Sequence, residues 1–212
     1  MCFHVKQTST AKAMSKRFDA EITSDFLFAP QDQINGFRFP LLPVITQQAP
    51  TLIQPFAWGL IPGWAKNDEI RKITLNAKIE TLQEKPAFKE VVSQRCLVIA
   101  NGFYEWQWLD SKGKKKLKYE IGFEKEALFA FAGLYSHWID GHTGNLKSTC
   151  TLITTVANEL MSSIHNIKKR MPVILQQNDE QSWLNQAPIT NFAYPYQVPL
   201  ITRKVSENYR LF

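Results

Sequence analysis

The chain runs RCLVIANGFYEWQW over residues 95–108. An apolar run, residues 96–100, is separated from an aromatic run, residues 103–108, by Asn101-Gly102, a pair typical of turns. Runs of β-branched and aromatic residues bounded by turn residues predict strands. This stretch is therefore expected to form two neighbouring strands, the second of which carries a single carboxylate, Glu105.

The pattern stays mostly β on the C-terminal side of this stretch. Asp110-Ser111-Lys112-Gly113 predicts a hairpin turn with a return strand over residues 118–123. Further strands are predicted at 127–137, 148–155 and 171–175, and short helices at 158–164 and 179–185.

The N-terminal half is more mixed. It predicts a marginal helix at 14–28, an extended loop at 37–46, an apolar loop with two tryptophans at 57–64, and a mostly helical stretch at 76–92 that Pro86 interrupts. Strands dominate and helices are appended to them, so the predicted fold class is α+β rather than alternating βαβ.

Length and composition favour one compact domain over residues 1–212. Of the 212 residues, 44% are hydrophobic and 12% aromatic, which is enough for a sizeable core, and no Gly/Ser-rich or Pro-rich linker divides the chain. Three scattered cysteines without a C-x-x-C pair indicate neither a disulfide framework nor a structural zinc site. The spacing of His137 and His142 is weak as a metal signal, and we expect no metal and no cofactor.

Hydropathy and charge set the expected surroundings of the protein. The longest nearly uncharged apolar run, residues 127–135, is far shorter than the ~20 residues of a membrane helix, and the N-terminal residues resemble no signal peptide. We therefore expect a soluble, cytoplasmic protein with no membrane partner. A formal net charge of +6 favours a polyanionic partner and leans toward nucleic acid.

The most informative single residue is Cys2. An initiator methionine is normally removed ahead of cysteine, and the mature chain would then carry an α-amine and a thiol on one residue. Such a 1,2-aminothiol can form an imine with an aldehyde and close it into a thiazolidine, and the reference pKa of the α-amine, ~7.7–8.0, leaves part of it nucleophilic near pH 7. The alternative is that Cys2 is an ordinary second residue.

Three further polar residues are candidates for the chemistry. Glu105 lies among aromatic residues; pointing inward, it would have a raised pKa suited to proton transfer, and pointing outward, it would pair with a lysine such as Lys118. His165 precedes several cations and is either a neutral base or a solvated loop residue. Asn76 either caps a helix or presents its amide to a reacting group.

Lysines and tryptophans offer means of binding a single strand. Tryptophans such as Trp64 and Trp106 can stack on unpaired bases, although core packing is the commoner role of a tryptophan. The lysine run at the predicted hairpin tip is explained as well by solvation of an exposed turn; it comprises Lys112, Lys114, Lys115, Lys116 and Lys118.

The ordered set of motifs strongly resembles the SRAP (SOS-response-associated peptidase) family. The set extends from residue 2 to about residue 205 and consists of Cys2, WGLIPGWAK at 58–66, NAKIET at 76–81, the stretch 96–106, and His165 followed by RMPVIL at 170–175. Each motif is weak alone, and the ordered set is specific. The resemblance implies a single SRAP domain with a mostly antiparallel, barrel-like sheet core and peripheral helices.

The resemblance also implies a function in DNA damage and repair. Members of the family shield abasic sites in single-stranded DNA, including junctions with duplex, through a covalent thiazolidine crosslink to the N-terminal cysteine. By motif position, Cys2 would be the nucleophile, Asn76 would orient its amine, Glu105 would promote ring opening and proton transfers, and His165 would assist at the sugar and in crosslink reversal. Contacts to DNA would come from Lys78 and Thr154 to phosphates, and from Pro40, Trp64 and Trp106 to bases.

Three departures from the family pattern affect the expected DNA contacts. Phe3 and His4 stand where the family usually has Gly-Arg, which removes an arginine that binds phosphate. Lys78 replaces the arginine of Asn-Ala-Arg and keeps a point charge without a bidentate fork. The spacing from His165 to Arg170-Met171-Pro172 is longer than the usual His-x-Arg-Met-Pro.

Two other functions remain open on sequence. A cysteine-dependent autopeptidase or amidohydrolase would use Cys2 with Glu105 and His165, and a noncovalent single-strand binding module would make no use of the Cys2 thiol. The expected protein acts as a monomer on abasic single-stranded DNA and associates with the nucleoid when bound.

Overall fold

A closed five-stranded β-barrel forms the centre of the molecule. The computed structural model describes residues 2–205, and within them the ring runs β11-β10-β7-β4-β5 and closes where β5 pairs with β11. The closing pair is parallel and the other four are antiparallel. The strands of the ring are β4 (Leu41–Thr46), β5 (Ala49–Trp58), β7 (Arg95–Ala100), β10 (Phe129–Ile139) and β11 (Leu146–Val156).

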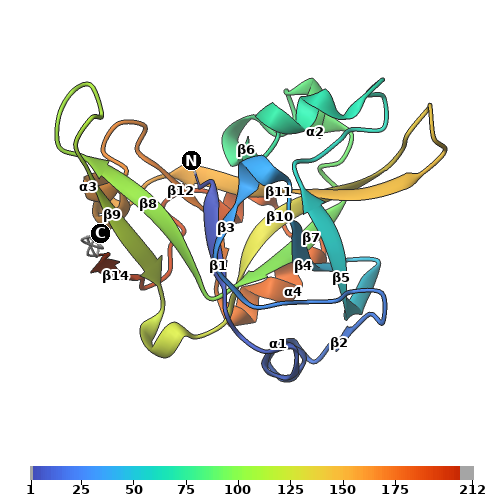
Figure 1. Ribbon diagram of the computed structural model, residues 1–212, viewed down its shortest axis with the longest axis horizontal. Coiled ribbons are helices and arrows are strands. Elements are labelled where there is room, and N and C mark those ends of the chain that lie inside the picture. The colour runs from blue at the N-terminus through green and yellow to red at the C-terminus, as the bar shows by residue number, and fades with distance from the viewer. Residues whose placement is uncertain (1, 206–212) are drawn as a thin grey trace, which may run out of the picture.

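A second sheet of five antiparallel strands lies beside the barrel (Figure 1). Its order is β14-β9-β8-β1-β3, so the N-terminal strand lies between two others and is paired on both sides. The strands are β1 (His4–Gln7), β3 (Gln31–Asn35), β8 (Gly102–Trp108), β9 (Lys116–Gly122) and β14 (Ile201–Lys204).

Short elements surround the two sheets. The remaining strands are β2 (Glu21–Ile22), β6 (Asn76–Lys78), β12 (Arg170–Pro172) and β13 (Ile174–Leu175). The α-helices are α1 (Ala11–Phe18), α2 (Pro86–Lys89), α3 (Glu159–Ile164) and α4 (Glu180–Leu184). The 3-10 helices are η1 (Gly36–Arg38), η2 (Asp68–Ile73), η3 (Ile79–Thr81), η4 (Glu124–Glu126), η5 (Gln177–Asp179) and η6 (Ile189–Phe192). Among residues 2–205 no helix is both long and apolar enough to span a bilayer.

The barrel wall is buried on both faces. All six residues of β7 are buried, and their side chains alternate between two apolar clusters, with Val98 and Ala100 in one and Leu97 and Ile99 in the other. Strands covered on both sides have continuous apolar sequences, which explains the unbroken run at 96–100. The predicted α+β class and the mostly antiparallel, barrel-like core are confirmed.

Three predictions for the N-terminal half are wrong. The marginal helix predicted at 14–28 is instead α1, which ends at Phe18 and is followed by β2. The predicted helix at 76–92 is instead β6, then η3, then the one-turn α2, whose first residue is Pro86. Proline is tolerated in the first turn of a helix, so Pro86 begins a helix where we expected it to interrupt one. The stretch 37–46, expected as a loop, contains β4, because Pro43 is accommodated in a strand whose buried residues pack in the barrel.

Candidate active site

Two of the predicted site residues, Cys2 and Asn76, are in contact. Strand β6 pairs in parallel with β11, with Asn76 opposite Leu152, and this pairing brings the Asn76 side chain to the start of β1. Its Nδ2 atom donates a hydrogen bond of 2.8 Å to the Cys2 carbonyl oxygen. Cys2 itself is 0% exposed, and its Sγ donates to the His4 carbonyl oxygen at 3.7 Å.

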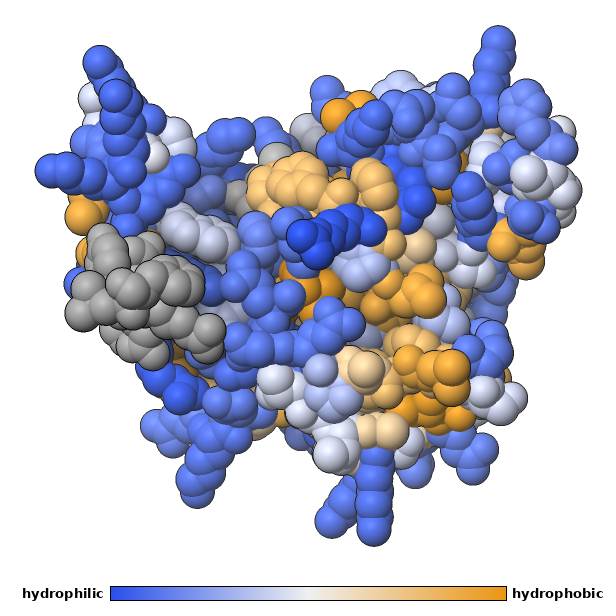
Figure 2. Space-filling view, viewed as in Figure 1, coloured by the Kyte–Doolittle hydropathy of each residue, from blue (hydrophilic) through white to orange (hydrophobic). Residues whose placement is uncertain are grey.

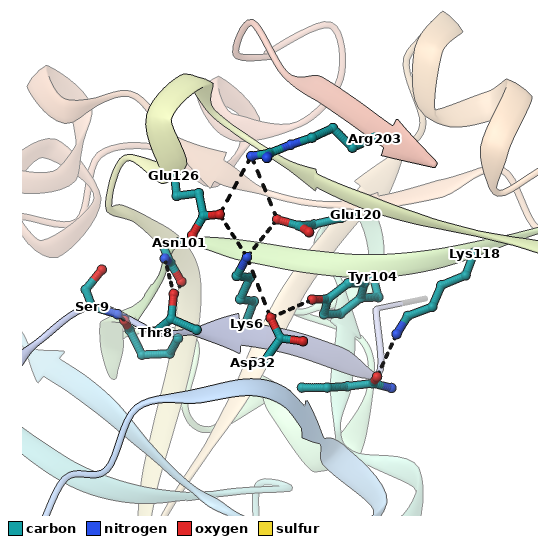
Figure 3. Close-up of polar contacts among 12 residues, drawn as sticks. Lys6, Thr8, Ser9, Asp32, Asn101, Tyr104, Lys118, Glu120, Glu126 and Arg203 are labelled. Atoms are coloured by element: carbon teal, nitrogen blue, oxygen red, sulfur yellow. Dashed lines mark hydrogen bonds and ion pairs between the residues drawn. The ribbon is translucent and has the colours of Figure 1, made fainter. Parts of the chain in front are cut away.

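A buried lysine fixes β1 behind Cys2 (Figure 3). Lys6 Nζ is 2.9 Å from Glu120 Oε1, 3.1 Å from Glu126 Oε1 and 3.6 Å from Asp32 Oδ1. These carboxylates come from β9, η4 and β3, which surround β1. The ion pairs therefore hold the strand that leads to Cys2 in a fixed position within the sheet.

Glu105 lies on β8, the strand next to β1, with its side chain directed inward. Only 6% of the residue is exposed, and burial raises the pKa of its carboxyl to about 7. Burial, together with the negative charge of Glu105, raises the pKa of the Cys2 thiol well above its usual value. The outward alternative does not occur, because Lys118 instead donates to Gln33 Oε1 at 2.6 Å.

His165 is the C-cap of α3, and its lowered pKa favours the neutral imidazole near pH 7. Its Nδ1 lies 2.7 Å from the Arg170 carbonyl oxygen, and we assign the proton to this nitrogen, which leaves Nε2 as an acceptor. Burial lowers the pKa of His165 most, and the charges of Lys168 and Arg170 lower it further. The expected effect of neighbouring cations is thus present, but it is smaller than the effect of burial.

The loop that carries His165 is bound to the strand that carries Glu105. Asn166 Oδ1 accepts from the Trp108 amide at 3.1 Å, and Asn166 Nδ2 donates to the Trp108 carbonyl oxygen at 2.8 Å. Gln107 Nε2 also donates to the Ser163 carbonyl oxygen at 2.9 Å. Two segments more than fifty residues apart in sequence are therefore held side by side next to Cys2.

The predicted DNA-contacting residues differ in their accessibility. Trp64 is 50% exposed and Lys78 is exposed, whereas Pro40 is partly buried. Trp106 is partly buried, with its ring 4.8 Å from the His4 ring and Lys118 Nζ 5.9 Å from its centroid. Trp64, Lys78 and Trp106 thus present surface to solvent.

Thr154 is placed differently from these residues. Thr154 is 0% exposed, and its hydroxyl donates to the Ala77 carbonyl oxygen at 3.3 Å. The carbonyl oxygen of Thr154 accepts a hydrogen bond of 2.8 Å from Arg170 Nη2. Thr154 therefore hydrogen-bonds to β6 and to Arg170 from a buried position. A phosphate contact by its hydroxyl stays a prediction.

Sequence reasoning assigned no role to the ion pair of Arg170 and Glu80. The guanidinium of Arg170 donates to both carboxylate oxygens of Glu80, at 2.9 and 2.8 Å. This pair connects β12, directly after the loop of His165, to η3, directly after Lys78. Arg170 lies within a motif that the sequence did single out, but its partner is ninety residues away and could not be identified from spacing.

A second unassigned feature is the exposed ring of Phe37 beside Phe3. The ring centroids are 4.7 Å apart, Phe37 is 53% exposed, and the Gly36 amide donates to the Phe3 carbonyl oxygen at 2.9 Å. An aromatic pair with one exposed ring, Phe37, and one partly buried ring, Phe3, therefore lies next to Cys2. The only sequence signal for it is the turn-forming Asn35-Gly36 that precedes Phe37.

The surface is hollowed between two projecting hairpins. The β8–β9 hairpin and the β10–β11 hairpin project on either side, and β1 begins between them (Figure 1). Figure 2 shows the molecular outline hollowed between these two projections. Within the described range 2–205, no group of three or more His, Cys, Asp or Glu side chains could hold a metal ion.

Residues 1–208 match the family described as SOS response associated peptidase (SRAP). The chain belongs to this family. The SRAP chain is 47% identical over 146 residues to abasic site processing protein YoaM of Bacillus subtilis, which covers 68% of this chain and 62% of that protein. It is 32% identical over 162 residues to abasic site processing protein HMCES of Gallus gallus, covering 65% of this chain and 46% of that protein. The SRAP chain thus spans less than two thirds of these relatives.

Solved structures share the SRAP chain's fold. A protein of Bacteroides thetaiotaomicron superposes with a TM-score of 0.87 at 34% identity, covering 97% of this chain and 93% of that one. A protein of Bordetella bronchiseptica superposes with a TM-score of 0.78 at 23% identity, which supports the fold alone.

Proposed function

We propose that this protein processes abasic sites in single-stranded DNA and shields them by forming a thiazolidine crosslink through Cys2. The observation that carries the proposal is that the buried Glu105, whose pKa is about 7, lies close enough to Cys2 for its charge to raise the pKa of the thiol. Asn76 also donates a hydrogen bond to the Cys2 carbonyl oxygen. The names of YoaM and HMCES describe abasic site processing, and membership of the same family supports that role here.

The proposed reaction begins with removal of Met1, which lies outside the described residues and whose peptide bond blocks the Cys2 amine. The freed amine attacks the aldehyde carbon of the ring-opened deoxyribose, and the carbinolamine loses water to give an imine. The Cys2 sulfur then bonds to the imine carbon, and the thiol proton passes to the nitrogen. The net change is loss of one water, so neither an oxidant nor a reductant is required.

Glu105 and His165 are suited to the proton transfers of this sequence. A carboxyl with a pKa of about 7 exists in both forms near neutral pH, so it can protonate the departing hydroxyl and accept a proton from the thiol. The neutral imidazole of His165 offers its Nε2 atom as a base at the sugar and in the reverse reaction. Asn76 orients the Cys2 backbone, so that the new amine faces the aldehyde.

Four side chains that reach the surface are suited to DNA held as a single strand. Trp64 and Trp106 would stack on bases, Pro40 would separate the strands at a junction with duplex, and Lys78 would contact a phosphate. Aromatic stacking contributes roughly 1–3 kcal/mol per base, without regard to sequence. The protein would bind such a strand as a monomer.

The thiol argues for this chemistry over peptide hydrolysis. Cysteine nucleophiles of peptidases have lowered pKa values, because the thiolate is the attacking form. The pKa of the Cys2 thiol is raised by burial and by Glu105, and its Sγ donates to a backbone carbonyl rather than to His165. A route in which the amine attacks first and the sulfur closes the ring afterwards does not need a thiolate at rest.

Variants of Cys2 test the proposal. Incubation of the mature protein with an abasic single-stranded oligonucleotide is expected to give a heat-stable band on a denaturing gel, with the mass of both components less one water. Cys2→Ala keeps an α-amine but lacks sulfur, so it should stop at the imine. Its adduct should be lost on heating and recovered only when borohydride reduces the C=N bond.

A heat-stable adduct of Cys2→Ala without borohydride would contradict thiazolidine formation. Cys150→Ala is the matched control, because Cys150 is equally buried in the barrel but lies within β11. It should crosslink as the unaltered protein does. Turnover of peptides in the absence of DNA would favour the amidohydrolase instead.

A further inference from the structure

The tip of the β8–β9 hairpin carries a dense group of positive charges beside the hollow. We name residues 109–116 the basic arm; its exposed lysines are Lys112, Lys114, Lys115 and Lys116. In Figure 1 the arm projects at the upper left, and Figure 2 shows this projection as almost entirely hydrophilic.

The turn of the basic arm is held by hydrogen bonds and ring packing of its own residues, which a turn that is merely solvated does not need. Asp110 accepts hydrogen bonds from the backbone amides of Lys112, Lys114 and Lys115. Gly113 has a φ of +64°, and a Cβ there would lie 2.6 Å from the Trp108 ring, so this ring packs directly on the backbone of the turn. The only carboxylate of the arm is thus used to organise the turn that presents its lysines.

The basic arm is also joined to the candidate active site. Both backbone groups of Trp108, at its base, are hydrogen-bonded to the side chain of Asn166, the residue after His165. The same loop adds two exposed lysines, Lys168 and Lys169. Six exposed lysines therefore lie on two segments that the hydrogen bonds between Asn166 and Trp108 join.

The β10–β11 hairpin, all of whose residues are described, carries no comparable group of lysines. At the β10–β11 hairpin, Asp140 faces Lys147 at 3.6 Å, and Lys147 also pairs with Asp68 at 3.0 Å. The positive charge of that hairpin is therefore already paired. Exposed lysines elsewhere, such as Lys66, Lys78 and Lys85, lie singly on separate segments. The basic arm differs from them because it gathers four lysines in one turn.

We propose that the basic arm is a second nucleic-acid site, which binds backbone phosphates of the strand on one side of the lesion. This inference rests on the proposed function, and it adds a direction to it: the strand leaves the active site past His165 toward the arm. Lysines are point charges that bind phosphates without reading sequence. Because the turn is already ordered, binding costs little further conformational entropy.

Two oligonucleotides and two triple variants test the inference. Each oligonucleotide carries a tetrahydrofuran analogue of the abasic site, which has no aldehyde, so binding stays reversible. One has a long single-stranded flank only 5′ of the lesion and the other only 3′. The arm variant replaces Lys112, Lys114 and Lys115 by Gln, and the control variant replaces the exposed Lys12, Lys16 and Lys204, on α1 and β14, by Gln.

The arm variant is expected to bind one of the two oligonucleotides about tenfold more weakly than the control variant. For that oligonucleotide the slope of log K against log salt should fall by about 2, because each phosphate contact on a single strand contributes about 0.7. Equal weakening of both oligonucleotides, or no difference from the control variant, would overturn the inference.

Asp110→Ala distinguishes an organised site from general attraction. It removes a negative charge from the arm, so charge counting predicts tighter binding, whereas loss of the braced turn predicts weaker binding of the same oligonucleotide. Tighter binding would overturn the inference. Absence of any covalent adduct with a true abasic oligonucleotide would instead refute the proposed function, and the reversible binding experiment would still decide the role of the arm.

Discussion

The burial of Glu105 lowers the stability of the folded protein at neutral pH and gives the carboxyl a pKa suited to proton transfer. Its aromatic neighbours in the sequence indicated an apolar surrounding, and in the structure burial raises the pKa of its carboxyl from 4.5 to about 7. The folded protein therefore keeps a proton on Glu105 over a pH range in which the unfolded chain has lost it. The free energy of unfolding must fall as pH rises through this range.

Glu105→Gln is expected to stabilise the protein at pH 8 and to leave its stability unchanged at pH 4. The gain at pH 8 should be at most about 3 kcal/mol, because the pKa changes from 4.5 to about 7 and each unit corresponds to about 1.4 kcal/mol. Urea unfolding of both proteins at the two pH values measures it. A gain of equal size at pH 4 would show that ionisation is not its cause.

The same variant should form the crosslink more slowly without losing affinity for DNA. Glutamine preserves the shape of the side chain but cannot exchange a proton, so the rate should fall by about 100-fold or more, within the usual range for general acid-base catalysis. Equal losses of rate and affinity would assign Glu105 to binding rather than to proton transfer.

At the scale of elements, local sequence predicted the strands whose apolar pattern is continuous. The predicted strands at 96–100 and 103–108 correspond to β7 and β8, because both have a run of residues suited to a sheet. Residues 76–78 belong to a stretch of good helix formers, yet they form β6, because pairing with β11 outweighs local propensity. Pairing between segments seventy residues apart leaves no local signal.

The same distinction applies to the candidate site. Glu105 and Cys2 could be chosen from their own surroundings and position in the chain. The hydrogen bonds from Asn166 to Trp108, and the ion pair of Arg170 with Glu80, join distant segments and could not be predicted. Sequence thus indicated the reacting groups more completely than the contacts that position them.

Asn166→Ala tests whether one such contact matters. It removes two of the three hydrogen bonds that tie the His165 region to β8, so we expect a loss of about 1–2 kcal/mol in unfolding free energy and a crosslinking rate about tenfold lower. Rates are measured under conditions in which both proteins are fully folded. Asn145→Ala, at the exposed tip of the β10–β11 hairpin, is the control; a matching rate in both variants would contradict a positioning role for Asn166.

At the scale of the whole molecule, the candidate residues are held partly by the closed barrel and partly by the second sheet. Strand β11 pairs with three strands besides β10. These are β6, which carries Asn76, β12, which begins with Arg170, and β5, which closes the ring. Strands β1 and β8 are paired with each other within the second sheet. A change deep in the barrel wall should therefore affect the stability of the fold as a unit.

Gly133→Ala is expected to show this dependence. Gly133 lies in the middle of β10, and a Cβ there would be 2.9 Å from both Cys96 Sγ and the Thr151 carbonyl oxygen, closer than a methyl group can approach. Because those atoms belong to the strands on either side, relief requires the barrel wall to move, and overpacking of this kind costs about 1–3 kcal/mol. Gly141→Ala is the matched control, since nothing lies within 4 Å of its added Cβ. The midpoint temperature of thermal unfolding should be lowered in Gly133→Ala alone, and unfolding should remain a single transition. Two separate transitions would mean that the barrel and the second sheet unfold independently.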